Sequence, residues 1–202
     1  MALNMFYFTQ SAEDLFDPVA GLTDPGVMES FRKGLVHARF HLVEALTLAQ
    51  PGGIHEDLCY HFQVASCLLT AWLDGIAVYV EKKVAVTPAQ GAVYWAANRT
   101  FIDPQFAELR AIQQTTNDHI IKGGITINTL RNLAKHYMPW SPLSSAGTGN
   151  DGGWDIRFPI DSVTKSGPVL RGLMFHVFND AVDAYEAFGR LMGMQVTQVL
   201  KL

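Results

Sequence analysis

The segment from Ile54 to Lys83 constrains the fold more than any other part of this 202-residue sequence. It contains no proline, and its apolar residues occur all round the helical repeat, which is typical of a helix buried on every side. Its most apolar part, from Val64 to Val80, includes Asp74 and Gly75 and is shorter than the ~20 residues that a membrane-spanning helix needs. We therefore interpret the segment as the central core helix and expect no association with a membrane.

Amphipathic segments on both sides are expected to pack against this helix. The first is predicted to begin at Asp24, as N-cap, with Pro25 at the first helical position, and to end at the break of residues 51–53. The last is predicted over residues 169–200. In both segments apolar residues recur every three or four positions, which predicts one buried face. These positions are Val27, Phe31, Leu35, Ala38, Leu42, Ala45, Leu46 and Ala49 in the first, and Leu170, Leu173, Met174, Val177, Phe178, Ala181, Tyr185, Phe188, Leu191 and Met192 in the last.

The rest of the chain adds shorter helices. Thr87-Pro88 and Asp103-Pro104 each predict a capped helix start, and residues 122–124 (Lys-Gly-Gly) predict the end of the second of these helices. A short helix is predicted over residues 127–138, stopped by Pro139. Together these signals predict an all-α fold, an antiparallel bundle of about five or six helices in one domain of residues 1–202, with residues 1–23 as an N-terminal arm.

Residues 139–168 interrupt the helical pattern. The region is rich in Gly, Pro and Ser, and only residues 154–160 have the composition of a strand. Stretches of this length without regular structure are uncommon in compact domains and are usually functional or mobile. We predict a loop insertion that contains one small strand.

Charge and composition indicate what kind of surface the protein has. Charged residues make up 17% of the chain, fewer than the ~25% of a typical domain. A surface with so few charges is expected to be partly covered by another copy, and we predict a homodimer. The net charge of −4 is not that of a protein that coats nucleic acid. Residues 119–140 nevertheless carry Lys122, Arg131 and Lys135 without any acid, which predicts a local positive patch.

No targeting signal or cofactor motif is recognised. Residues 1–10 lack the basic stretch and apolar run of a signal peptide, so we expect a cytoplasmic location. The run from Gly147 to Gly152 has the letters of a dinucleotide-binding fingerprint, but the flanking sequence predicts neither the strand nor the helix that it needs. Cys59 and Cys67 are too far apart along one predicted helix to bridge and lack zinc-site spacing. We expect no cofactor and two free thiols.

A metal site is one alternative function. His37, His41 and Glu44 fall within a stripe of about 60° on the first helix, at 3.6 residues per turn. Imidazoles and a carboxylate at this spacing are suitable ligands for zinc or iron. The stripe lies opposite the apolar face, so a metal there would sit at the surface or between two helices. In the second case His55 and His61 of the next helix could complete the site.

Residues 131–136, Arg-Asn-Leu-Ala-Lys-His, carry groups that suit RNA chemistry. His136, with an ordinary pKa of ~6.5, can exchange a proton with a ribose hydroxyl or a leaving oxygen. Arg131 can bind phosphate and stabilise charge that develops on the phosphoryl oxygens. Asn132, one turn before His136, can orient either group. This combination is suited to metal-independent RNA cleavage in which the 2′-hydroxyl is the nucleophile.

The segment resembles the Arg-x4–6-His signature of the HEPN superfamily, the higher eukaryotes and prokaryotes nucleotide-binding domains, in which a polar residue, often Asn, follows the arginine. The resemblance covers residues 131–136 and the helical architecture. It implies an all-α bundle, commonly dimeric, with a composite ribonuclease site at the dimer interface formed by Arg131, Asn132 and His136. Many members act in toxin–antitoxin, phage-defence or CRISPR systems, which implies an antitoxin-type protein partner. Other members have lost catalysis and only bind.

The spacing alone is not specific. Arg-x4-His occurs three times in the chain, from Arg32, Arg131 and Arg171, and only Arg131 is followed by Asn. Residues five apart also diverge by about 140° on an ideal helix, so a distorted helix end or a second subunit would have to bring the pair together. If the segment is a site, Lys135 and Trp140 are expected to bind substrate, the latter by stacking on a base. A non-catalytic dimeric interaction domain is the third alternative.

Overall fold

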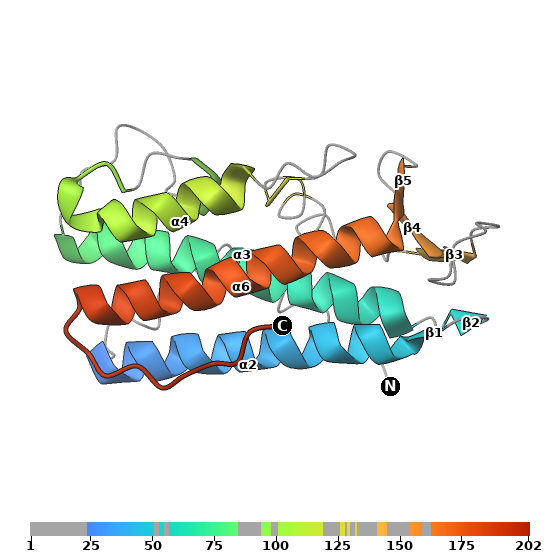
Figure 1. Ribbon diagram of the computed structural model, residues 1–202, viewed down its shortest axis with the longest axis horizontal. Helices are drawn as coiled ribbons and strands as arrows, with labels where there is room; N and C mark the ends of the chain where they lie inside the picture. The colour runs from blue at the N-terminus through green and yellow to red at the C-terminus, as the bar shows by residue number, and fades with distance from the viewer. Residues whose placement is uncertain are drawn as a thin grey trace.

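The computed structural model shows a bundle of helices lying side by side along the longest axis of the molecule (Figure 1). It describes residues 24–50, 53–54, 57–84, 94–97, 101–118, 126–127, 129, 132, 141–144, 154–158 and 163–202. Within these ranges the α-helices are α2 (Asp24–Leu48), α3 (Asp57–Val84), α4 (Ala107–Asp118) and α6 (Gly167–Leu191). Their direction alternates along the chain (Figure 1), so the predicted all-α antiparallel bundle is confirmed.

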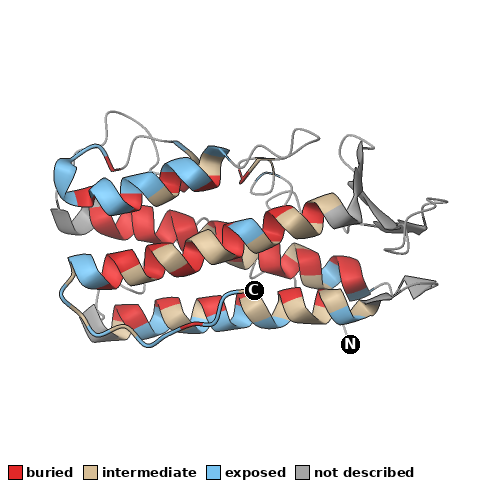
Figure 2. Ribbon diagram, viewed as in Figure 1, coloured by how far each residue is buried: buried red, intermediate tan, exposed pale blue. Residues whose placement is uncertain are grey.

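The apolar stripes predicted from the sequence form the core. Along α2 the buried side chains include Val27, Phe31, Leu35 and Leu42, each at most 2% exposed. Figure 2 shows this buried face turned toward α3 and α6, while the opposite face of α2 is exposed. The buried residues of α6 are Leu170, Leu173, Met174, Val177, Phe178, Ala181, Val182, Ala184, Tyr185, Ala187 and Phe188.

Helix α3 is the central element of the bundle. It is long and apolar enough to cross a membrane by length and composition, but 78% of the qualifying window is buried inside the protein. This burial is typical of a core helix, as the sequence predicted. Asp74, which interrupts its apolar run, is 5% exposed, and its Oδ1 accepts a hydrogen bond of 2.9 Å from the backbone N–H of Trp95. The carboxylate therefore has a structural role: it holds the short 3₁₀ helix η3 (Trp95–Ala97) against α3.

The start of α4 agrees with the predicted capping signal. Asp103 has an extended backbone, and its side chain accepts a hydrogen bond of 3.0 Å from the N–H of Gln105. Pro104 then opens the 3₁₀ helix η4 (Pro104–Phe106), which leads directly into α4. The carbonyl of Trp95 accepts a hydrogen bond of 2.8 Å from Gln113, so α4 is joined through η3 to α3.

The last helix ends earlier than predicted. Helix α6 stops at Leu191, whereas the sequence predicted helix to residue 200. Gly193 has a φ of 64°, and the N–H groups of Gly193 and Met194 donate to the carbonyls of Arg190 and Gly189. This pair of bonds is a Schellman motif, which a glycine in the left-handed region readily forms.

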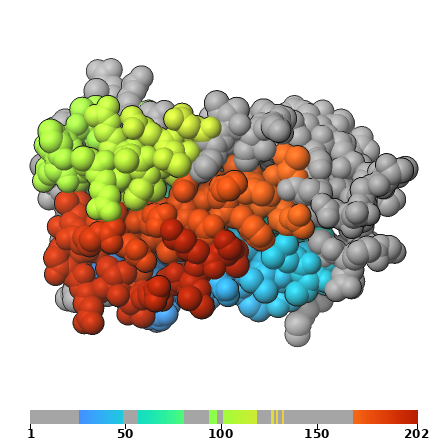
Figure 3. Space-filling model, in the orientation of Figure 1, coloured from blue at the N-terminus to red at the C-terminus, as the bar shows by residue number. Residues whose placement is uncertain are grey.

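Residues 194–202 follow α6 as an extended segment, here called the C-terminal strap. It runs back over α6 and α2 (Figure 1), and in the space-filling view it lies flat on the molecular surface (Figure 3). Val199 in the strap is 5% exposed, so the segment adds apolar side chains to the core.

The predicted loop insertion contains more strand than expected. Strands β3 (Ser141–Ser144), β4 (Trp154–Phe158) and β5 (Val163–Ser166) form an antiparallel sheet in the order β3-β4-β5. Strand β4 confirms the strand predicted at residues 154–160. The prediction missed β3 and β5 because both are four residues long and polar, and β3 contains a proline, which an edge strand tolerates. A smaller pairing, β1 (Ala49–Gln50) with β2 (Gly53–Ile54), joins α2 to α3.

Candidate functional site

The predicted RNA site falls largely outside the described part of the structure. Arg131, Lys135, His136 and Trp140 lie outside the described residues. Asn132 is described, and it is helical and exposed. The convergence of Arg131 with His136 therefore remains a prediction.

The described residues around Asn132 define the start and orientation of its helix. Thr126 precedes the helical residue Ile127, and its Oγ1 accepts a hydrogen bond of 3.1 Å from the N–H of Thr129. This is the bond of an N-cap to the third helical residue. Ile127 is 4% exposed and Asn132 is exposed, as expected for positions about 140° apart around a helix. The segment therefore turns Ile127 into the core and Asn132 to the surface.

The other two Arg-x4-His pairs lie on long helices. On α2, Nε and Nη2 of Arg32 each donate to the carboxylate of Glu29 at 2.7 Å. This guanidinium is therefore already engaged in an ion pair within its own helix. The neighbouring carboxylate raises the pKa of Arg32. On α6, Arg171 is half-buried and His176 is exposed. This second pair has the spacing of the predicted site without the asparagine.

The metal alternative built on His37, His41 and Glu44 is not supported. Across the described ranges, no three His, Cys, Asp or Glu side chains come together as a group that could hold a metal ion. His37 is exposed and Glu44 is half-buried, while His41 makes its hydrogen bond toward α3. The stripe on α2 is present as predicted, but its members do not converge.

His41 instead pairs with His61 on α3. The Nδ1 atoms of the two imidazoles lie 2.8 Å apart, and their ring centroids are 5.0 Å apart at an angle of 42°. In such a contact one Nδ1 carries the proton and donates the hydrogen bond, and the other Nδ1 accepts the hydrogen bond. The pair therefore joins the two helices that pack most extensively on each other, and it does so at the end of the bundle near the β1–β2 connection.

Two aromatic rings flank this pair. Phe40 is 54% exposed and Tyr60 is 46% exposed, although both are large. Phe40 meets the ring of His41 edge to face at 5.2 Å between centroids, and Tyr60 meets the ring of His61 in the same way at 5.4 Å. We call these four residues the histidine–aromatic cluster. The cluster therefore presents two exposed aromatic rings beside two half-buried imidazoles.

Burial and neighbouring histidines affect the protonation of His41. Burial lowers its pKa, and the nearby imidazoles of His61 and His37 lower the pKa further. A neutral imidazole has a nitrogen lone pair that can coordinate a metal ion. The lowered pKa of His41 therefore favours the form of this ring that can donate a nitrogen lone pair.

The cysteines take no part in chemistry. Cys59 is buried and Cys67 is partly buried, and both are free thiols, as the sequence predicted. Burial raises the pKa of each to about 12. A thiol with this pKa is not a nucleophile near neutral pH.

The sequence reasoning missed the histidine–aromatic cluster as a unit. A signal was present, because the dipeptides Phe40-His41 and Tyr60-His61 place the same pair of side chains on consecutive helices. What the sequence lacks is the register between α2 and α3, which brings one dipeptide opposite the other.

The fold and the described site define an all-α helical-bundle domain with a histidine–aromatic cluster between its first two described helices. No protein-family model matches the chain, and neither the curated proteins nor the solved structures contain a match to it.

Proposed function

We propose that this chain is a HEPN-like helical domain that binds RNA or nucleotides, and that it cleaves RNA without a metal ion. The proposal rests on the sequence of residues 131–136 and on the all-α bundle that the described residues form. The single structural observation in its favour is that Asn132 is helical and exposed, while Ile127, which follows the cap at Thr126, is buried. The polar side of a surface helix is where a phosphate can bind.

Each side chain has a distinct role in the proposed reaction. His136 takes the proton of a ribose 2′-hydroxyl, which attacks the adjacent phosphorus, and a proton is returned to the leaving 5′-oxygen. Arg131 binds the phosphate with charge-assisted hydrogen bonds and stabilises the negative charge that develops on it. Asn132 orients the histidine or the phosphate. Lys135 binds a neighbouring phosphate, and Trp140 stacks on a base.

A second copy of the chain is part of the proposal. Residues five apart on a helix diverge by about 140°, so two copies that face each other supply Arg131 and His136 to one phosphate more easily than one copy does. We accordingly propose a homodimer in the cytoplasm. In the manner of the family it resembles, an antitoxin-type protein is the proposed partner.

Cleavage of RNA in the presence of EDTA tests this function. Arg131→Ala and His136→Ala are expected to lower the cleavage rate at least about 100-fold, which is the scale of a lost general acid–base or charge-stabilising group. Arg171→Ala and His176→Ala are the matched controls, because they alter the same residue types at the same spacing on α6. Both control variants are expected to cleave as the unaltered protein does.

If Arg131→Ala and His136→Ala cleave RNA as fast as the unaltered protein does, the activity belongs to other residues. RNA binding without cleavage would leave a binding domain, and the absence of both would leave the non-catalytic interaction domain.

A further inference from the structure

We propose that His41 and His61 bind one divalent transition-metal ion, of the zinc, nickel or copper class, between α2 and α3. The inference is independent of the RNA function, because it uses neither residues 131–136 nor the helix after Thr126. It differs from the metal site predicted from the sequence, since it uses neither His37 nor Glu44 and takes His41 and His61 as its two protein ligands.

The distance between the two nitrogen atoms carries the inference. A metal ion held by two imidazoles at ~2.0–2.1 Å, with an angle of roughly 90–110° at the metal, keeps their nitrogens about 2.9–3.4 Å apart. The two Nδ1 atoms already lie 2.8 Å apart and face each other. The two nitrogen atoms need to separate by only a few tenths of an ångström, and both rings must tilt so that their lone pairs point at an ion that lies beside the line between the nitrogens.

The proton balance of the exchange is simple. In the hydrogen-bonded pair one ring carries its proton on Nδ1, and this atom must lose it to become a ligand. The proton moves to Nε2 of the same ring by exchange with water, so both rings bind the ion as neutral imidazoles with Nε2–H. No proton is released overall when both rings are neutral.

The surroundings fit an open metal site rather than a closed structural one. His41 and His61 are both half-buried, so one side of the pair is accessible to solvent. Water, or an anion that comes with a ligand, can fill the coordination positions that the protein leaves open. The exposed rings of Phe40 and Tyr60 border the opening and would contact such a ligand. Imidazole donors favour zinc, nickel and copper over magnesium and calcium.

Binding is measured by calorimetric titration of zinc or nickel chloride into the purified full chain free of any polyhistidine tag, at pH 7.5. We expect one ion per chain. Because the ion joins two helices of the folded state, the thermal midpoint is expected to rise by roughly 5–10 °C at an ion concentration one hundred times the Kd. Magnesium chloride is expected to have no effect.

Substitutions separate this site from other histidine pairs. His41→Ala and His61→Ala are each expected to abolish the binding heat and the thermal shift. His37→Ala tests whether His37 and His41, one turn apart on α2, chelate the ion instead, and His176→Ala controls for an exposed histidine. Both of these variants are expected to bind as the unaltered protein does.

One result with the unaltered protein does not depend on the folding of any variant. In NMR spectra, the imidazole signals of His41 and His61 are expected to shift on addition of zinc, while those of His176 stay in place. The proposal is overturned by no binding of zinc or nickel at millimolar concentration, by unshifted signals of His41 and His61, or by binding that survives His61→Ala and disappears in His37→Ala.

Discussion

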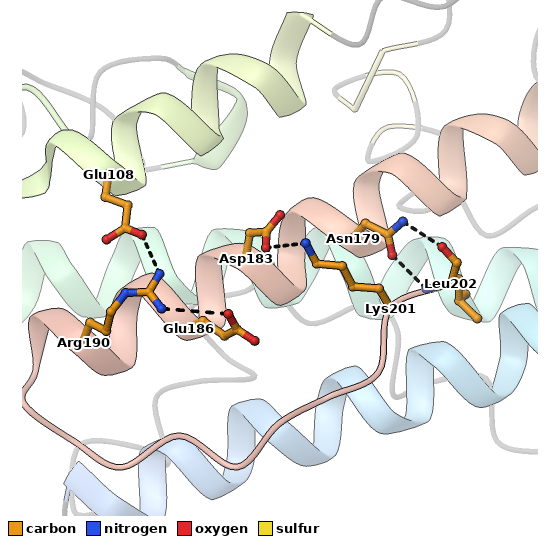
Figure 4. Close-up of polar contacts among 7 residues, drawn as sticks. All are labelled: Glu108, Asn179, Asp183, Glu186, Arg190, Lys201 and Leu202. Atoms are coloured by element: carbon orange, nitrogen blue, oxygen red, sulfur yellow. Dashed lines mark hydrogen bonds and ion pairs between the residues drawn. The ribbon is translucent and has the colours of Figure 1, made fainter.

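The side chain of Asn179 on α6 and the backbone of Leu202 in the C-terminal strap are joined by two hydrogen bonds. The side-chain Nδ2 of Asn179 donates to the carbonyl of Leu202 at 2.9 Å, and its Oδ1 accepts from the N–H of Leu202 at the same distance (Figure 4). Lys201 forms an ion pair of 2.6 Å with Asp183 on the same helix. Since Arg39 of α2 donates to the carbonyl of Leu200 at 3.1 Å, the strap is tied to both helices that it crosses.

The first prediction concerns this pair of bonds. Asn179→Ala is expected to lower the free energy of unfolding by about 1–2 kcal/mol, because two partly buried hydrogen bonds are lost and neither backbone group is paired by the alanine. Urea denaturation followed by circular dichroism measures the change. A midpoint that alanine leaves unchanged would show that the strap does not stabilise the fold.

Gly189 tests how closely the strap packs on α6. A Cβ at this position would lie 2.1 Å from Cγ2 of Val196 and 3.0 Å from Cε of Met28. Gly189→Ala is therefore expected to displace the strap and to lower the free energy of unfolding by about 1–3 kcal/mol, as overpacking does. The double variant with Val196→Ala is expected to recover part of this loss in the same denaturation measurement.

Gly172 on α6 is the matched control for Gly189. Nothing lies within 4 Å of a Cβ built there. Gly172→Ala is expected to raise the free energy of unfolding by about 0.5–1 kcal/mol, because alanine loses less backbone entropy than glycine in a helix. Equal destabilisation by both substitutions would contradict the packing of the strap described above.

The thiols give a prediction about reactivity and pH. Burial raises the pKa of Cys59 and Cys67 from 9.0 to about 12, so the thiolate fraction at pH 8 falls by roughly a thousandfold. Both thiols are expected to react with a disulfide reagent over hours in the folded protein and within seconds in denaturant. The rate in the folded state is expected to rise with pH up to about 12. Fast reaction of the folded protein at pH 8 would show that this part of α3 opens to solvent.

Local signals in the sequence predicted the bundle well. The start of α2 at Asp24, the cap at Asp103 and the apolar stripes of α2 and α6 depend on neighbours within a few residues, which the sequence displays directly. The end of α6 was predicted wrongly because Leu191 and Met192 continue the apolar spacing, while the left-handed residue Gly193 is what ends the helix.

Contacts between distant residues could not be predicted in the same way. His41 and His61 are twenty positions apart, and only the register of α2 against α3 brings their Nδ1 atoms together. In the sequence, His41 groups with His37 and Glu44 on its own helix, where the spacing is visible, and His61 is only a residue that could complete that site. The strap contacts of Asn179 and Arg39 were missed for the same reason. Arg131 and His136 lie beyond the described ranges, so their meeting at one phosphate remains a prediction.

Binding of a short RNA whose 2′-hydroxyls are methylated tests whether Arg131 binds an RNA phosphate, because this RNA can bind but cannot supply the attacking oxygen. Fluorescence anisotropy at a fixed salt concentration gives the Kd for the unaltered protein, Arg131→Ala and Arg171→Ala. We predict that Arg131→Ala weakens binding about 10- to 100-fold, as the loss of a charged hydrogen bond to phosphate does, and that Arg171→Ala leaves the Kd unchanged. Equal Kd values for the three proteins would show that Arg131 does not bind the RNA and would contradict the proposed site.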